Sequence, residues 1–278
     1  MRFIHLADVH LGAVPDRGCP WSKEREEEIW STFRRVIAGI REDPVDLLFI
    51  SGDLFHRQPL MRELKEVNYL FSTIPDTRVY LMAGNHDFIS RDSFYNTFEW
   101  NSNVTFFKSR ELTCVKDPRL DVYVYGLSYY DREIKEGLYD KAVPIQEEGI
   151  HILLAHGGDE KHIPLSAASL AAAGFDIICH GTNHALDKGK TGLLNCIQFW
   201  RTNYPQIGIL GIHDSQEDRD SLYIYEKNGI RVAVLNYTYG TNGISLPAGM
   251  PYAVDLLEEE QVVEDIRRAE EAADFTIV

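Results

Sequence analysis

Three features that classify many proteins are missing from this sequence of 278 residues. No apolar run approaches the roughly 20 residues that a membrane-spanning helix needs. The four cysteines are widely spaced and include no Cys-x-x-Cys pair, so disulfides and cysteine-bound zinc are disfavoured and buried free thiols are expected. The short apolar start is followed at once by a charge, which does not fit a secretory signal. We therefore expect a cytoplasmic protein that does not enter a membrane.

Basic residues are also scarce. The sequence has 28 lysines and arginines against 43 acidic residues, a net charge of −15, and no cluster of basic residues marks a nucleic-acid-binding surface. Attraction to phosphate normally supplies much of the affinity of a protein for nucleic acid. If DNA is the substrate, bound metal ions and a partner must supply part of that attraction.

Short apolar runs alternate with amphipathic segments. The predicted strands are continuous β-branched or aromatic runs, typical of sheets covered on both faces, at residues 3–7, 46–51, 79–83, 122–126, 151–155 and 175–179. Two segments, 23–42 and 60–74, have apolar residues at helical spacing. This alternation predicts an α/β layered fold, in which ligands bind at the carboxyl ends of the strands.

The alternation continues in the last third of the chain. The predicted elements there are a helix at 191–203, a strand at 206–211, a strand pair at 222–226 and 231–237 around an Asn-Gly turn, and a charged helix at 258–273. Residues 275–278 begin a further apolar strand, so we expect a truncated or hybrid C-terminal part.

Four motifs stand where predicted strands end. In chain order they are Asp8-Val9-His10, Gly52-Asp53, Gly84-Asn85-His86-Asp87 and Ala155-His156-Gly157-Gly158. Each is common in loops when taken alone, but the ordered set predicts ligands for two metal ions. Such a pair, about 3.5–4 Å apart, neutralises a phosphodiester and activates a water.

The ligand types suggest how the side chains are divided between the two ions. Asp8 and His10 can address one ion because Val9 points away, Asp53 can bridge both ions, and Asn85 and His156 can complete the second. Mixed oxygen and nitrogen ligands suit Mn(II), Fe(II) or Zn(II) better than Ca(II).

Other polar residues have separate predicted roles. His86 is predicted to be a catalytic group that is not a ligand, with Asp87 orienting it. His56 is either a surface loop residue or a substrate contact. His5, His151 and His213 lack a motif context and are predicted to be structural.

The motifs carry a family resemblance over residues 1–180. Four motifs resemble those of the calcineurin-like metallophosphoesterases: Asp8-Val9-His10-Leu11-Gly12, Ser51-Gly52-Asp53-Leu54-Phe55-His56, Gly84-Asn85-His86-Asp87 and Ala155-His156-Gly157-Gly158. Among these proteins, the first two motifs resemble the SbcD-type DNA repair exonucleases. The resemblance implies a four-layer α-β-β-α sandwich, two manganese ions and cleavage of DNA. It also implies an SbcC-type ATPase as partner, and a homodimer is a further expectation.

The last motif of that family departs from its pattern. The expected Gly-His-x-His is Gly181-Thr182-Asn183-His184 here. His184 matches the second imidazole and is predicted to be a metal ligand, whereas Thr182 replaces the first. His180 lies two residues earlier, about 6–7 Å from that position if the segment is extended.

From residue 174 onward the sequence resembles a different family. The segments 182–189, 228–235 and 237–240 resemble the CapA-type poly-γ-glutamate capsule proteins. We therefore predict a metallophosphoesterase region at 1–180 and a CapA-like continuation at 181–278, packed on the same sandwich.

Taken together, these patterns predict a metal-dependent phosphodiester hydrolase, most simply a DNA exonuclease subunit. Three alternatives stay open: a CapA-like capsule biosynthesis protein, a phosphatase for a small substrate, and an inactive hybrid fold.

Overall fold

The computed structural model describes residues 1–15, 17–117, 119–140, 142–157, 161–164, 168, 171, 174–227 and 229–278. Gly158 of the fourth motif and Asn228 of the predicted turn lie outside these residues. The chain divides into two compact units, Phe3–Ala173 and Gly174–Val278. Each unit is described by itself below.

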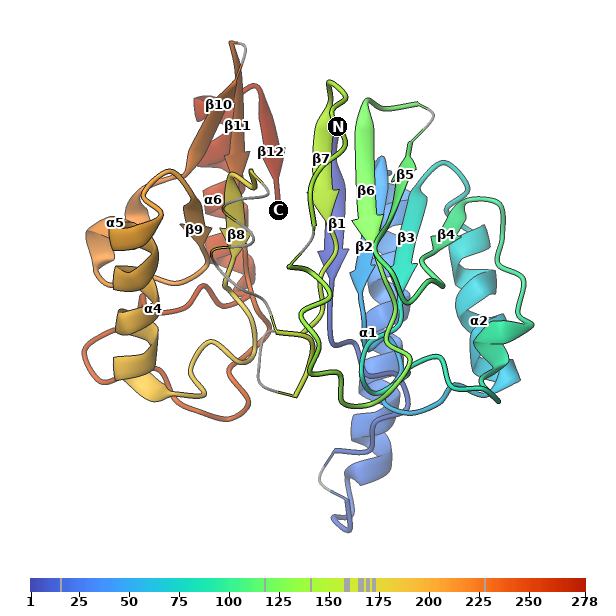
Figure 1. The fold of residues 1–278 in the computed structure, drawn as a ribbon. Coiled ribbons are helices and arrows are strands. Elements are labelled where there is room, and N and C mark those ends of the chain that lie inside the picture. The colour runs from blue at the N-terminus through green and yellow to red at the C-terminus, as the bar shows by residue number, and fades with distance from the viewer. Residues whose placement is uncertain are drawn as a thin grey trace. The chain divides into compact units, whose positions relative to one another are not determined.

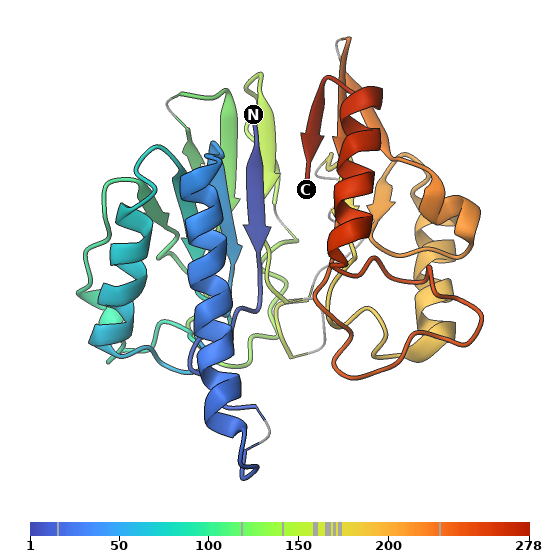
Figure 2. The same cartoon turned by 180° about the vertical axis from the view of Figure 1, so that it is seen from behind.

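The first unit is built on a parallel sheet. Its four strands follow chain order, β1 (Phe3–Leu6), β2 (Leu47–Ser51), β3 (Arg78–Met82) and β4 (Val104–Phe106). Helices α1 (Ser22–Glu42) and α2 (Met61–Ser72) lie side by side against one face of this sheet (Figure 1, Figure 2).

Strand β2 shows why the sheet is covered on both faces. All five of its residues are buried. Leu48 and Ile50 pack with the apolar side of α1 and α2, whereas Leu47 and Phe49 point the other way into a second cluster. Because side chains alternate along a strand, a continuous apolar run needs a layer on each face.

The second layer is a smaller mixed sheet. Its strands are β5 (Thr113–Lys116), β6 (Val122–Gly126) and β7 (Ile150–Leu153), with β5 antiparallel and β7 parallel to β6. A short 3-10 helix, η1 (Phe94–Asn96), follows β3. The predicted α/β class is confirmed, and the described residues of this unit form an α-β-β stack.

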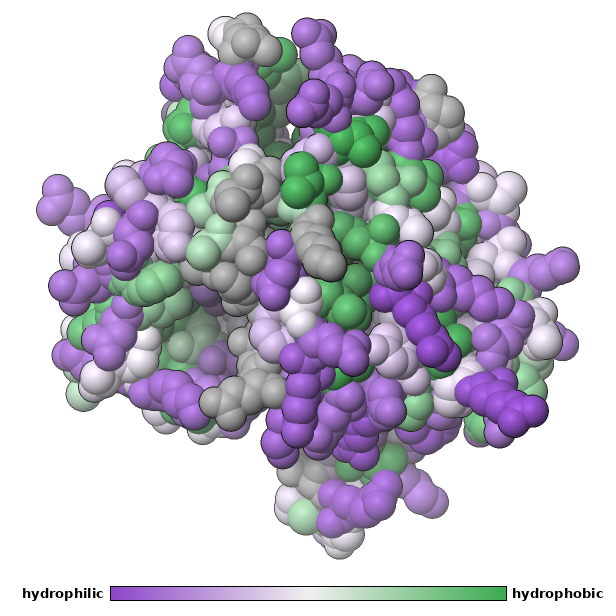
Figure 3. All heavy atoms as spheres, viewed as in Figure 1, coloured by the Kyte–Doolittle hydropathy of each residue, from purple (hydrophilic) through white to green (hydrophobic). Residues whose placement is uncertain are grey.

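Apolar side chains appear over the β5–β7 region (Figure 3). The exposed apolar residues of the neighbouring chain segments include Val143, Ile145 and Ile150. A further layer would cover such a face, so the fourth layer of the predicted sandwich stays a prediction.

The described residues of the second unit, 174–227 and 229–278, form two small sheets and three helices. Strands β8 (Ile177–Cys179) and β9 (Gly208–Leu210) pair in parallel, and β11 (Ile230–Val234) pairs with β10 (Ile224–Lys227) and β12 (Phe275–Ile277). The helices are α4 (Gly189–Asn203), α5 (Gln216–Asp220) and α6 (Glu259–Ala272). Its own core includes Leu193 and Ile197 of α4, packed with Ile212 and Val254.

The sequence patterns identified most of these elements, with ends shifted by up to three residues. They missed β4, β5, η1 and α5, which have only three to five residues each and are too short to show a period. The four thiols are free as expected, but none of them is buried: Cys114 and Cys179 are exposed, and Cys19 and Cys196 are half-buried. No helix in the described part of the chain is long and apolar enough to cross a membrane.

Candidate metal centre

The loops after β1 and β2 hold three polar residues in an uncommon backbone conformation. Asp8, His10 and Asp53 have φ angles of 53°, 53° and 49°. Few residues other than glycine adopt positive φ, and such strain clusters at functional sites. Two backbone hydrogen bonds tie the loops together, from His10 N to Asp53 O at 2.9 Å and from Leu11 N to Leu54 O at 2.8 Å. The fold thus holds these three side chains at one edge of the sheet.

Asp53 lies at the centre of the group and is only 2% exposed. Its Oδ1 accepts a hydrogen bond from the backbone N–H of His86 at 2.8 Å. Its Oδ2 lies 3.8 Å from His10 Nε2 and 3.6 Å from His156 Nε2. Burial by itself raises the pKa of Asp53, but the hydrogen bond and charge of His156 lower it below its usual value. The carboxylate therefore faces two imidazoles at once.

His156 is oriented so that one ring nitrogen is available to a cation. Its Nδ1 lies 2.9 Å from the carbonyl oxygen of Ser51, which can only accept a hydrogen bond. Nδ1 must therefore carry the proton in the neutral ring, which leaves Nε2 as an acceptor. Nε2 faces Asn85 Oδ1 at 2.9 Å. A backbone carbonyl that fixes the tautomer of a histidine is a usual feature of metal sites.

The spacing of the donor atoms fits divalent ions. Asp8 Oδ1 lies 3.6 Å from His10 Nε2. Asp8, His10 and Asp53 each offer one ligand atom, and these three atoms lie within 4.8 Å of one another. Ligands that bind one ion at about 2.0–2.2 Å lie roughly 3–4 Å apart. Val9, between the first two ligands, packs against the core. The predicted pairing of Asp8 with His10 is thus geometrically feasible.

Protonation competes with a metal ion at His156. Burial lowers the pKa of this ring, but the hydrogen bond and charge of Asp53, together with Asp8, raise it to about 9. These same carboxylates would attract a cation. The donor set therefore suits a positive charge at this position, whether a proton or a metal ion.

Two glycines allow the loops to approach this closely. A Cβ on Gly52, whose φ is 85°, would lie 2.7 Å from the His156 ring. A Cβ on Gly84 would collide with the carboxylate and backbone nitrogen of Asp53. Both positions thus need a residue without a side chain.

Three histidines form a cluster beside Asp53. His10 lies with its ring centroid 4.8 Å from that of His86 and 5.2 Å from that of His56, and the rings of His56 and His86 stack at 4.9 Å. Burial, followed by the charges of His10 and His86, lowers the pKa of His56. His56 therefore lies within the cluster, and one nitrogen from each ring could reach a shared ion.

Asp87 differs from the predicted role. We expected the Asp87 carboxylate to orient His86. Instead, its Oδ1 accepts a hydrogen bond from Gly84 N at 2.8 Å. Its Oδ2 accepts hydrogen bonds from Phe55 N at 3.2 Å and from Tyr95 Oη at 2.9 Å. Desolvation raises the pKa of this fully buried carboxyl to about 7. His86 Nδ1 instead lies 3.1 Å from His56 O. Asp87 is thus a positioning residue for the loop after β3, because its carboxyl is occupied by three other donors.

His184 belongs to the second unit, and its contacts lie there. Its Nδ1 is 2.8 Å from Asp187 Oδ2, and its side chain is 61% exposed. Thr182 Oγ1 accepts from His184 N at 3.3 Å, and Thr182 and His184 line a cavity of about 190 Å³ together with His180. The metal-ligand role of His184 therefore stays a prediction.

The histidines that we predict to be structural have hydrogen-bond partners. His5 Nε2 lies 2.6 Å from Ser51 Oγ. His151 contacts Tyr125 Oη at 2.8 Å, and His213 contacts Asp255 Oδ2 at 2.8 Å.

Sequence reasoning missed two tyrosines that support His156. Tyr129 Oη donates to His156 O at 2.9 Å, and His156 N donates to Tyr139 Oη at 3.2 Å. Both tyrosines are buried. Neither belongs to a motif, so no local pattern could have revealed them.

Two protein families match this chain. Residues 1–186 match the family described as calcineurin-like phosphoesterase. The chain belongs to this family. Residues 161–278 match the family described as bacterial capsule synthesis protein PGA_cap, which confirms the second resemblance. Members of the calcineurin-like family act as hydrolases with divalent metal ions, and the donor atoms around Asp53 fit such ions.

Several relatives of this phosphoesterase are archaeal proteins named DNA double-strand break repair protein Mre11. The protein of Methanocaldococcus jannaschii is 27% identical over 173 residues, 59% of this chain and 46% of the relative. That of Archaeoglobus fulgidus is 39% identical over 106 residues, 36% of this chain and 22% of the relative. That of Haloferax volcanii is 26% identical over 201 residues, 68% of this chain and 42% of the relative. The chain therefore spans less than half the length of these relatives.

Proposed function

We propose that this phosphoesterase hydrolyses phosphodiester bonds of DNA at a two-metal centre, as an exonuclease. One observation carries the proposal: the buried carboxylate of Asp53 lies 3.8 Å from His10 Nε2 and 3.6 Å from His156 Nε2. A carboxylate between two sets of donors is what two adjacent cations require. Asp8 and His10 would complete the first ion, and Asn85 and His156 the second. The mixed oxygen and nitrogen donors suit Mn(II), Fe(II) or Zn(II) better than Ca(II). Among these, manganese is proposed because the resemblance to the SbcD-type exonucleases implies it.

The relatives supply the substrate in this proposal. The names of the three archaeal proteins refer to repair of DNA double-strand breaks. An ATPase partner of SbcC type and a homodimer belong to the same proposal.

The residues around the ions would position the reaction. When bound, two divalent ions would neutralise the diester and activate a water. His86 Nδ1 lies 3.1 Å from the carbonyl oxygen of His56, which can only accept a hydrogen bond, so Nδ1 carries the proton in the neutral ring. Nε2 is then available to interact with the substrate. His56 stacks on His86 and limits its rotation. The protonated form of His86 could then stabilise the leaving oxygen and transfer a proton to it.

The test is removal of the bridging charge. Asp53→Asn should lose both manganese ions and at least about a hundredfold of the activity, because one substitution affects two ions. Metal content by mass spectrometry and digestion of end-labelled linear duplex DNA measure these effects. Asp76→Asn, at an exposed aspartate after α2, is the matched control and should behave like wild type. Retention of two ions by Asp53→Asn would show that Asp53 is not the bridge.

A second candidate function rests on the acidic composition and the capsule-family match. The net charge of −15 disfavours polyanions, so a small phosphodiester is the alternative substrate. Parallel assays with linear DNA and a chromogenic diester separate the two, because only a nuclease prefers DNA. Absence of both activities in the manganese-loaded protein would favour an inactive hybrid fold.

A further inference from the structure

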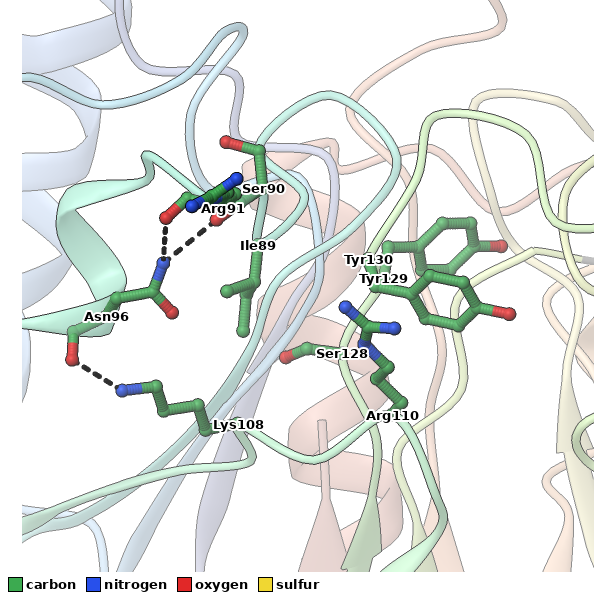
Figure 4. Close-up of a pocket in the computed structure, with 9 residues that line it drawn as sticks. All are labelled: Ile89, Ser90, Arg91, Asn96, Lys108, Arg110, Ser128, Tyr129 and Tyr130. Carbon is green, nitrogen blue, oxygen red and sulfur yellow. Dashed lines mark hydrogen bonds between the residues drawn. The ribbon is translucent and has the colours of Figure 1, made fainter.

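A cavity of about 550 Å³ lies in the first unit, between the loop after β3 and the loop after β6. Its lining carries three basic side chains, Arg91, Lys108 and Arg110 (Figure 4). They are 17 and 2 residues apart in the sequence, so only the fold brings them together. No contiguous stretch of the sequence contains a basic cluster, but the fold forms one at this cavity.

The two arginines keep their donors available. In the part of the chain that the structure describes, no hydrogen bond or ion pair engages the guanidinium of Arg91 or Arg110. Arg110 lies 4.6 Å above the ring of Tyr130, which holds it in place without using its N–H groups. The Tyr130 hydroxyl donates to the carboxylate of Glu136 at 2.8 Å.

The third cation is fixed at the cavity wall. Lys108 Nζ donates one hydrogen bond to Asn96 O at 2.7 Å and keeps two donors free. The side-chain amide of Asn96 donates to the carbonyl oxygens of Ser90 and Arg91 at 2.9 Å and 3.0 Å (Figure 4). The ammonium group of Lys108 is therefore held at the cavity wall by Asn96, which is itself hydrogen-bonded to the backbone.

The cavity adjoins the candidate metal centre through one residue. Tyr129 lines the cavity, and its hydroxyl donates to His156 O at 2.9 Å. The backbone of Tyr129 also binds the chain on either side of the Gly84–Asp87 loop, with Tyr129 N donating to Ala83 O and Ile89 N to Tyr129 O. Tyr129 therefore links the cavity wall to the backbone of His156 and to the chain on either side of the Gly84–Asp87 loop.

We propose that this cavity binds a backbone phosphate of a nucleic-acid strand, next to the phosphate that is cleaved at the metal centre. Arginine forks match phosphate oxygens and Tyr130 offers an aromatic surface, a combination typical of single-strand binding. The site would supply, locally, the electrostatic attraction that the acidic chain otherwise lacks. This inference rests on the proposed function, since a DNA strand must reach the same edge of the sheet.

The test compares two double variants of equal charge change. Arg91→Gln/Arg110→Gln removes the cavity cations, and Arg35→Gln/Arg62→Gln removes two arginines of α1 and α2 as a control. Binding of a fluorescent single-stranded oligonucleotide is followed by anisotropy in EDTA, where no hydrolysis occurs, over a series of salt concentrations. The cavity variant should bind about tenfold more weakly. Its salt slope should be lower by about 0.7 for each phosphate that is no longer neutralised, the value for single strands.

Two further arms make the result specific. Arg91→Lys/Arg110→Lys keeps the charges and should retain most of the affinity. Inorganic phosphate should compete with the oligonucleotide for wild type but much less for the cavity variant. In manganese, the cavity variant should lose at least about ten times more kcat/KM on the oligonucleotide than on a chromogenic diester.

Equal losses in the cavity and control variants would overturn the proposal, because overall charge would then explain them. Loss of phosphate competition with unchanged oligonucleotide affinity would also overturn it, in favour of a site for free phosphate. If wild type binds the oligonucleotide but hydrolyses no DNA, the proposed function fails, while the EDTA comparison still decides the role of the cavity.

Discussion

Three residues at the metal centre adopt a backbone conformation that is uncommon outside glycine, although aspartate and histidine tolerate it better than most residues. Asp8, His10 and Asp53 all have positive φ, which costs roughly 1–3 kcal/mol for each residue. The surrounding hydrogen bonds and the burial of Asp53 offset that strain. A side chain held in this way is already in place before a ligand arrives, which lowers the entropy cost of binding.

His86 is the residue whose substitution best separates catalysis from metal binding. His86→Ala should lower kcat by roughly 10²–10⁴-fold, the range for a positioned acid–base group. Manganese content should stay near that of wild type, since Asp53 is bound by the backbone N–H of residue 86, which alanine keeps. Steady-state kinetics and metal analysis of the same preparation measure both quantities. Joint loss of metal and activity would instead identify His86 as a ligand within the histidine cluster.

At the scale of elements, the second unit is joined by a charged network. His213, after β9, lies 2.8 Å from Asp255 Oδ2 and 3.4 Å from Asp218 of α5. Arg219 of α5 pairs with Asp255, and with Asp265 of α6 at 2.6 Å. The network therefore links two helices to the loop before α6.

This network predicts a pH dependence of stability. Burial lowers the pKa of His213, but hydrogen bonds and charges of Asp218 and Asp255 raise it to about 9. A folded-state pKa above the unfolded value of 6.5 stabilises the fold fully below pH 6.5, and this contribution is lost as the pH rises through about 9. The shift corresponds to roughly 3 kcal/mol in the free energy of unfolding.

Denaturant unfolding at pH 6.5, 8 and 9.5 measures this loss. His213→Gln should be less stable than wild type at pH 6.5 and should lose less stability between pH 6.5 and 9.5. Parallel pH profiles for the two proteins would show that the imidazolium does not stabilise the second unit.

At the scale of the whole molecule, the Thr182→His variant tests whether the loop at residues 181–184 follows the phosphoesterase register. Thr182 stands where the phosphoesterase pattern has a ligand, and a neutral hydroxyl is a poor ligand for a divalent ion. Thr182→His restores Gly-His-x-His. If the loop follows the phosphoesterase register, this variant should bind the second manganese ion more tightly and be more active at low manganese.

A manganese titration of activity for wild type and Thr182→His is the measurement. Thr182→Val, which also removes the hydroxyl but adds no ligand, is the control and should not gain activity. Superimposable curves for wild type and Thr182→His would show that the loop follows the capsule-protein register and that His184 is not a ligand.

The sequence by itself determined the α/β class, most elements and the identity of the candidate ligands. Apolar periodicity is a local property, so it reports helices such as α1 and buried strands such as β2 directly. Motifs at strand ends could be grouped because parallel strands end at one edge of a sheet. The order of the four motifs along the chain was therefore enough to identify the family.

Only the tertiary structure decided how those residues are held. The tautomer of His156 depends on Ser51, 105 residues away in the chain, and Asp87 binds Phe55 and Tyr95 rather than the neighbouring imidazole. The cavity of Arg91, Lys108 and Arg110 likewise forms from loops that are separate in sequence. Hydrogen bonds and charge clusters are set by distances in space, and no local pattern encodes which distant backbone group will meet a given side chain.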